Sequence, residues 1–521
     1  MKDFIKLDAM RNTKRNNRYT LLCGALIASL LFSCSEFDEI NTNPDTTTEV
    51  SASMLCTNVV LSTARFGGRD AKVMIAENAL PKYVGYANEG QLNEQYNKIS
   101  TGSFGGMTVL PNIEDMVKYA EGSTMESSYK GVAKFARAFL FFNLTMEMGD
   151  VPYSETNQGP EGLYTPKYDP QETIFKGILD ELKEADQFFA SGVTFTGDPT
   201  PYNGDPVKWR KATNALALRV LMTLSKKESV ASLNIKSRFA EIVAAGNLMD
   251  KTSDFFGLNY TSLNKHPLSG TNDLFTSRTI ISSLLLDQLK LLNDRRMFYY
   301  SEPAAAEIAA GKTESDPEAY VGVDVSMDYA AMNAGHSANQ YSLLNKRYLT
   351  EDACEPRMVI SYAEQQLILA EARIKGWITT GTAQAYYESG VKSALGAIMA
   401  TKASYAHGNA ITQAYIDNYF TGEAAFKATA EDQLKQIWMQ RYILNYMQIG
   451  QSSYFEYRRT GYPVFPIDPA TSLNENNRNG LPLRWMYPGS EASYNRENLI
   501  EALERQYDGY DEINKVMWLL K

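Results

Sequence analysis

Few side chains in this 521-residue chain have the types and spacing that catalysis or metal binding requires. The three histidines form no His-x-x-x-His pair, and no Gly-x-Ser-x-Gly turn, P-loop or dinucleotide fingerprint is present. Cys56 and Cys354 lie far apart, have no zinc-site spacing, and leave open whether they pair with each other. The 61 acidic residues are too many for one catalytic carboxylate pair to stand out. We therefore predict no enzyme, no cofactor and no metal site.

Cys34 is the one cysteine whose surroundings indicate a chemical role. Basic residues between positions 11 and 18 precede an apolar run from about Leu21 to Phe32. This run is shorter than the ~20 residues of a membrane-spanning helix, but it suits the core of a secretory signal. The order Leu31-Phe32-Ser33 before Cys34 is typical of the end of a bacterial lipoprotein signal. We predict that residues 1–33 are a signal peptide and that Cys34 becomes the lipidated first residue, the alternative being a plain secretion signal.

Residues 34–50 are predicted to form a flexible acidic and polar tether. Acidic residues follow Cys34 closely, as in the surface-export signal of Bacteroidetes lipoproteins, although an ordinary acidic linker has the same composition. Residues 1–33 carry six basic and two acidic side chains (net +4), so −14 remains for residues 34–521 from the total of −10. This charge disfavours nucleic acid as a partner and leaves the acyl chains as the attachment to the membrane.

Helical periodicity recurs along the rest of the chain. Apolar side chains of the segment 127–148 follow i, i+3, i+4 spacing, and Gly149 followed by Pro152 is expected to end that helix. The same pattern predicts helices that open at Asp169-Pro170 and at Asp205-Pro206, and helices over about 356–374 and 432–447.

Long segments rich in Gly, Asn, Ser and Tyr separate these helices, at about 84–112, 250–275, 298–350 and 451–495. Loops of this length in a compact domain are usually functional. Alanines recur inside the helices, which allows the close helix pairing of tetratricopeptide repeats, although no clean repeat period is present. We predict a mostly α fold for a single domain, 51–521: a tetratricopeptide-like scaffold of helical pairs, with long irregular loops that carry the binding face.

Several short motifs follow one another in an order that covers most of the chain: Asn41–Asp45, Gly149–Glu155, Tyr168–Ala185, Trp209–Arg219, Ser361–Trp377, Tyr386–Val391, Arg458–Pro463 and Arg484–Pro488. This order resembles the SusD/RagB family of nutrient-binding outer-membrane lipoproteins of Bacteroidetes. The charged residues of these motifs need not contact a ligand. Arg219, Glu364, Glu371 and Arg373 are equally able to form a solvated or paired helix face, and Arg458-Arg459 are able to cap helix ends or to pair with buried carboxylates. We expect structural roles for them.

The resemblance implies a receptor on the outer face of the outer membrane. Such a protein captures oligosaccharide or polysaccharide and passes it to a SusC-like TonB-dependent transporter. Two other hypotheses remain: a peptide receptor of the RagB kind on the same scaffold, and a surface hydrolase, which the absence of catalytic motifs disfavours.

Three loops are candidate ligand sites, because aromatic rings stack on sugar faces while amides bond to hydroxyl groups. The preferred site is the first loop, whose position resembles that of the ligand-facing loop of the family. It begins at Lys82 and contains Tyr83, Tyr86, Asn88, Gln91 and Tyr96. The second contains Tyr260, Asn264, His266, Asn272 and Phe275, and the third contains Tyr299, Tyr300, Tyr320 and Tyr341. For any one tyrosine, loop packing or transporter contact is the alternative. His266 is interpreted as a polar loop residue rather than a metal ligand.

Overall fold

The computed structural model describes residues 50–66, 71–87, 90, 92–270 and 277–521. The predicted signal peptide, Cys34 and nearly all of the tether lie outside these residues. Residues from Ser51 to Lys521 form one compact unit. Among the described residues, no helix combines the length and the apolar character needed to cross a membrane.

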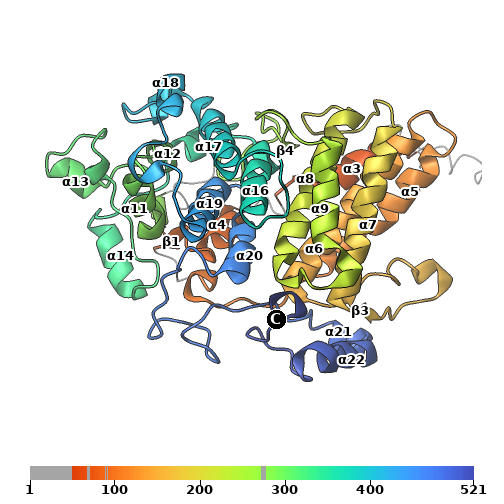
Figure 1. Cartoon of the computed structure of the whole chain (residues 1–521). Helices are drawn as coiled ribbons and strands as arrows, with labels where there is room; N and C mark the ends of the chain where they lie inside the picture. The colour runs from red at the N-terminus through yellow and green to blue at the C-terminus, as the bar shows by residue number, and fades with distance from the viewer. Residues whose placement is uncertain (1–49, 67–70, 88–89, 91, 271–276) are drawn as a thin grey trace, which may run out of the picture. The chain divides into compact units, whose positions relative to one another are not determined.

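Helical pairs form the scaffold, as predicted from the periodicity. The helices α6, α7, α8 and α9 lie side by side, and each contacts the next (Figure 1). A second group packs α16 against α17 and α19, with α20 following α19. The bounds of these pairs are α6 Glu126–Met148 with α7 Gln171–Ala190, α8 Pro206–Thr223 with α9 Ile235–Ala245, α16 Tyr362–Ile374 with α17 Ala383–Met399, and α19 Ala430–Asn445 with α20 Gly450–Thr460.

Local sequence signals explain where these helices begin and end. The Asp205 carboxylate accepts a hydrogen bond from Val207 N–H (2.9 Å) and so caps α8, which begins at Pro206. Gly149 ends α6 with a φ of +91°, and a Cβ at this position would collide with the Tyr507 hydroxyl. Glycine is therefore required at this turn both for its backbone conformation and for space.

The remaining helices surround these pairs. At the N-terminal side lie α3 Ala52–Ala64, α4 Ala71–Ala79 and α5 Leu110–Ala120. The shorter helices are α11 Ser283–Leu291, α12 Arg296–Tyr300, α13 Ala305–Ala309, α14 Tyr329–Ser337, α15 Arg347–Thr350, α18 Gln413–Asp417, α21 Glu491–Tyr494 and α22 Arg496–Tyr507.

Within the described residues, three antiparallel two-stranded sheets join segments that are separated in the sequence. In the first, β1 Val84–Tyr86 pairs with β5 Thr279–Ile281; in the second, β2 Val151–Pro152 pairs with β3 Tyr168–Asp169; in the third, β4 Phe256–Leu258 pairs with β6 Arg357–Ile360. Each joins segments that the sequence analysis treated as loops or as helix starts.

Three predicted boundaries were wrong. The helix expected over 356–374 begins only at Tyr362, because Arg357–Ile360 pairs with β4 as a strand. The segment 451–495 begins with the helix α20, and the segment 298–350 contains four short helices, α12 to α15. The α20 residues begin with glycine and two serines, so tertiary contacts of Tyr454 and Phe455 stabilise a helix that propensity disfavours.

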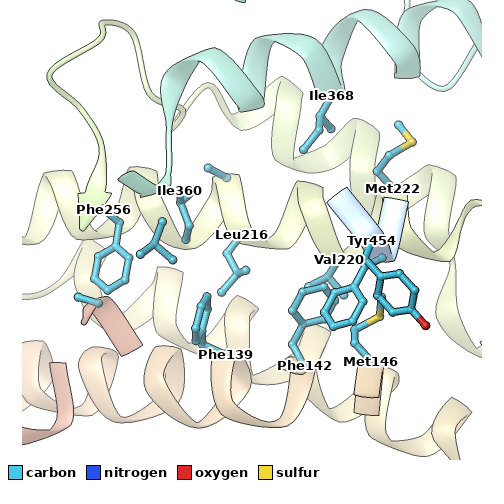
Figure 2. Packing of buried hydrophobic residues seen from close by; sticks show 14 of the residues in the cluster. Phe139, Phe142, Met146, Leu216, Val220, Met222, Phe256, Ile360, Ile368 and Tyr454 are labelled. Atoms are coloured by element: carbon cyan, nitrogen blue, oxygen red, sulfur yellow. The ribbon is translucent and has the colours of Figure 1, made fainter. Parts of the chain in front are cut away.

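One large hydrophobic core runs through the helical pairs. Figure 2 shows how α6 supplies Phe139, Phe142 and Met146 to this core, where they lie among residues of α8, β4, β6, α16 and α20. A smaller cluster beside β5 is formed by Ala87, Ile280, Val323, Val325 and Met332. The mostly α, tetratricopeptide-like fold is thus confirmed, and the regular core supports the irregular segments that carry the candidate site.

Candidate functional site

The charged residues of the sequence motifs lie inside the scaffold. Arg219 of α8 binds both carboxylate oxygens of Glu364 on α16, and Arg459 of α20 donates to both oxygens of Glu371 at 2.6 and 2.8 Å. Arg441 of α19 donates to Glu456 at 2.6 Å. We call these six residues the Arg–Glu core. They bind one another across four helices, so the motifs position the helices rather than a ligand.

The environment of the Arg–Glu core keeps the Glu456 carboxylate charged. Burial alone would raise the pKa of Glu456, but Arg441 and Arg459 hold that pKa below its ordinary value. The Trp438 indole N–H also donates to Glu371, at 3.0 Å. These charges are balanced inside the protein, and nothing in them calls for an added ligand.

The first predicted loop requires a correction. Tyr83 is fully buried, stacks on Tyr442 with ring centroids 4.2 Å apart, and its hydroxyl bonds to Tyr442 O and to Ser453 Oγ. Tyr86 and Tyr96 are buried as well, and the Tyr96 hydroxyl donates to Met327 O at 2.9 Å. These rings have no face open to a ligand, because they hold the loop against the scaffold. Asn88 and Gln91 lie outside the described residues.

Lys82, at the start of the same loop, is buried too. Its Nζ donates to Gln95 O at 2.5 Å and to Asn97 Oδ1 at 2.7 Å. Burial lowers the pKa of Lys82 to about 7, against the opposing effect of Asp324. The Lys82 ammonium therefore bonds to oxygen atoms of the loop from inside the protein, and the side chain does not reach the surface.

The third predicted segment requires the same correction for three of its four tyrosines. Tyr299, Tyr300 and Tyr320 are buried, and the Tyr320 hydroxyl donates to Glu314 O at 2.8 Å. Tyr341 is only half-buried. Of the four tyrosines predicted in this segment, only Tyr341 is partly accessible to solvent.

The second predicted loop does form a cavity, with a volume of about 330 Å³. We call it the Tyr260 cavity; it is lined by Arg65, Phe66, Tyr260, Leu263, Asn264, Lys265, His266, Pro267, Ser269 and Gly270. Three predicted residues, Tyr260, Asn264 and His266, thus meet at one place, whereas Asn272 and Phe275 lie outside the described residues. A larger hollow of about 480 Å³ lies between α7, α8 and α9, but no aromatic side chain lines it.

Hydrogen bonds to the backbone fix the shape of the Tyr260 cavity. Thr261 N–H donates to Asn264 O at 2.8 Å, and the Thr261 hydroxyl accepts from Asn264 N–H at 3.1 Å, which closes a tight turn. On the next residues, His266 N–H donates to Asp352 O and Gly270 N–H donates to Leu349 O. The turn exposes 97% of Leu263, an apolar side chain at the mouth of the cavity.

The cavity wall combines an aromatic ring, an amide and cations. Half-buried Tyr260 packs edge-on against His266, with ring centroids 5.1 Å apart. Arg65 Nη2 donates to Asn264 Oδ1 at 3.2 Å, which joins the end of α3 to a turn 199 residues away. An exposed apolar face beside polar donors is what binding of a sugar ring requires.

His266 is a structural member of this wall. Burial and the nearby Arg347 and Arg357 lower the pKa of His266 to about 3, so its ring is neutral, and Nδ1 accepts a hydrogen bond from Leu268 N–H at 3.3 Å. In the part of the chain that the structure describes, no group of three or more His, Cys, Asp or Glu side chains could hold a metal ion. Cys56 and Cys354 are both buried and unpaired.

Sequence reasoning missed Arg65, Phe66 and Leu263. Arg65 and Phe66 follow α3 directly and resemble any helix end, and a single exposed leucine in a polar loop carries no signal. Only the fold brings residues 65 and 264 together.

Comparisons with known proteins agree with this architecture. Residues 44–488 match a SusD-like family model described as starch-binding and associating with the outer membrane. The crystal structure of a SusD homolog from Bacteroides fragilis is 39% identical and aligns over 91% of this chain and 100% of its own length, with a TM-score of 0.86. No match was found among curated protein sequences.

Two further solved structures extend the comparison. A protein from Bacteroides vulgatus, described as an outer-membrane protein probably involved in nutrient binding, is 32% identical over 91% of this chain and 100% of its own, with a TM-score of 0.82. A chitin-binding protein is 25% identical over 90% of this chain and 100% of its own, with a TM-score of 0.71.

Proposed function

Because this chain belongs to the SusD-like family of proteins that associate with the outer membrane, we propose that it is a nutrient receptor without catalytic activity. It captures an oligosaccharide or polysaccharide at the cell surface and delivers it to a SusC-like TonB-dependent transporter. The observation that carries this proposal is the family match over residues 44–488, together with similarity along the full length of a SusD homolog.

We place the ligand at the Tyr260 cavity. Tyr260 supplies a half-buried aromatic face, Leu263 an exposed apolar contact, and Asn264 an amide for sugar hydroxyl groups. Affinity for a single well-hydrated glycan is expected to be modest, because each new hydrogen bond replaces one with water.

The test is a panel of polysaccharides and a peptide mixture, measured by affinity electrophoresis and calorimetry with the mature protein, residues 34–521. We expect binding to one glycan class, weakened about 3- to 10-fold by Tyr260→Ala because the stacking contact is lost. Tyr494→Ala is the matched control, since Tyr494 is 80% exposed and lies outside the cavity.

Each outcome separates the alternatives. Binding of peptides but of no glycan would replace the glycan receptor by a peptide receptor. If Tyr260→Ala leaves glycan affinity unchanged, the glycan-receptor function would stand, but the proposed site would be wrong. Tyr341 would then be the next tyrosine to replace. Release of cleaved sugar into solution would contradict the non-enzymatic part of the proposal.

The membrane attachment is proposed to depend on the acyl chains at Cys34. The motif before Cys34 supports this, as does the family's association with the outer membrane. In cell fractionation we expect Cys34→Ala to move the protein from the membrane to the soluble fraction without lowering its Tm. Retention of Cys34→Ala in the membrane fraction would contradict lipid anchoring.

A further inference from the structure

The charge of the Tyr260 cavity differs from the charge of the chain as a whole. The chain carries a net −10, yet the charged side chains that line the cavity are Arg65 and Lys265, and no acidic side chain is among its described lining residues. A concave site lined by one sign of charge concentrates ligands of the opposite sign.

Arg65 is the cation at the centre of this argument. Its side chain donates to Asn264 Oδ1, a neutral acceptor, and among the described residues no carboxylate lies within ion-pair distance of it. Its position after the last turn of α3 favours a cation, since helix C-termini carry partial negative charge. This interaction with the helix end does not occupy the N–H groups of the Arg65 guanidinium, so those that do not bond to Asn264 remain available to a ligand.

A second guanidinium without a carboxylate partner lies behind the cavity wall. Arg357 is stacked over the Phe66 ring at 5.0 Å, donates to Gln448 O at 3.2 Å, and its Nε has no hydrogen-bond partner in the described part of the chain. Both arginines influence Tyr260: burial raises the pKa of its hydroxyl to about 12, while Arg357 and Arg65 act in the opposite direction.

Lys265 contributes less. Its Nζ lies 3.1 Å from Asp352 Oδ1, which also accepts from the Ser269 hydroxyl at 2.7 Å. The Lys265 charge is therefore largely balanced. Arg65 is the cavity cation without an ion-pair partner among the described residues, whereas Glu77 acts on the charge of Arg357.

We propose that the Tyr260 cavity selects acidic glycans, in which an anionic group of the sugar pairs with Arg65. The guanidinium fork matches a carboxylate or sulfate with two parallel hydrogen bonds, Tyr260 and Leu263 contact the apolar face of the same ring, and the Asn264 amide serves its hydroxyl groups. This inference rests on the proposed glycan-binding function and names its substrate class. The anionic group is either the carboxylate of a uronic acid or a sulfate ester.

The experiment compares polymers that differ only in charge. Calorimetry with the mature protein measures binding of two pairs of polymers, at low and at high salt. The first pair is polygalacturonate and its methyl ester. The second pair is chondroitin sulfate and the same polymer after its sulfates are removed and its carboxylates are methylated. We expect the acidic member of one pair to bind at least tenfold more tightly than its neutral counterpart, and this advantage to shrink at high salt. The pair that shows the advantage identifies the polymer backbone.

Two variants locate the effect. Arg65→Gln is expected to weaken binding of the acidic polymer about tenfold and to leave binding of the neutral polymer unchanged, because it removes a charged hydrogen bond and little volume. Arg496→Gln is the matched control: it makes the same charge change at an exposed arginine of α22 and should have no effect.

Other results would overturn the inference. If the unaltered protein binds the charged and the neutral polymers equally, the inference is wrong, whether or not Arg65→Gln folds. The proposed glycan-receptor function would still stand. Undiminished acidic-polymer binding by folded Arg65→Gln contradicts the assigned site. Binding of poly-glutamate in place of every glycan contradicts both this inference and the proposed function.

Discussion

The Arg–Glu core and the Tyr260 cavity use arginine in opposite ways. Each of the three arginines of the core binds a carboxylate on another helix, and Arg459 also binds Glu456 of its own helix. At the cavity, Arg65 and Arg357 bind neutral oxygens, and no described carboxylate pairs with them. The balanced charges of the core hold the scaffold together, whereas Arg65 at the cavity is the cation that we propose for ligand binding.

The same contrast applies to tyrosine. Tyr83 and Tyr320 are buried and bond to backbone oxygens, while Tyr260 keeps part of its ring at a cavity wall. Residue type alone therefore does not separate a buried tyrosine from an accessible one; burial and hydrogen-bond partners do.

The largest expected effect comes from breaking the Arg–Glu core. Glu371→Ala removes one carboxylate from the buried core and leaves Glu456 to face both Arg459 and Arg441, and we expect the excess of buried positive charge to lower the free energy of unfolding by about 3–5 kcal/mol. Urea unfolding followed by circular dichroism measures this loss. Glu431→Ala is the control: it breaks an exposed pair with Lys435 and should leave the free energy of unfolding nearly unchanged. A loss below about 1 kcal/mol for Glu371→Ala would show that the core is not a structural requirement.

A smaller effect is expected from Tyr83→Phe, which tests whether the first loop is structural. The substitution leaves Ser453 Oγ and Tyr442 O without the Tyr83 hydroxyl, so we expect a loss of about 1–2 kcal/mol in the free energy of unfolding. Glycan affinity of the folded variant should be unchanged, with Tyr164→Phe as the exposed control. Weaker glycan binding at unchanged stability would return Tyr83 to the ligand site and contradict its structural role.

The smallest effect concerns Glu77, a carboxyl group that bears on the charge of Arg357. Burial raises the pKa of Glu77 to about 7, with Arg357 acting against the shift and Glu147 adding to it. A raised carboxyl pKa means that this group's stabilisation is complete below about pH 4 and is lost as the pH rises through 7. Glu77→Gln should therefore raise Tm by about 1–2 °C at pH 8 and by less at pH 5.

Thermal unfolding over pH 5 to 8 measures this difference, with Glu475→Gln as an exposed control. An equal Tm shift at both pH values would mean that Glu77 titrates normally. Burial lowers the pKa of Arg357, and the charge of Glu77 acts in the opposite direction. Because Glu77→Gln removes that negative charge, the variant should also leave the surroundings of the Tyr260 cavity more positive.

Much of the scaffold was readable from the sequence, because its causes are local. The period of apolar residues in α6, the aspartate cap before Pro206 and the glycine at position 149 each act within a few residues. The family motifs were equally readable, and in this chain their charged residues join helices α8, α16 and α20. What failed were segments governed by distant contacts: Arg357–Ile360 becomes a strand because of Phe256–Leu258, and α20 is helical because its aromatic residues pack into the core.

For the candidate site, the sequence alone determined the chemistry available: tyrosines and amides in long loops, no catalytic motif, and a family resemblance. It named Tyr260, Asn264 and His266 only as the second candidate, after the loop of Tyr83, because burial is a property of the whole fold. Only the tertiary structure decided which rings stay accessible, and only it placed Arg65 beside Asn264 across 199 residues. The physical reason is that a helix is specified by neighbours in sequence, whereas a cavity and the charges left open in it are specified by neighbours in space.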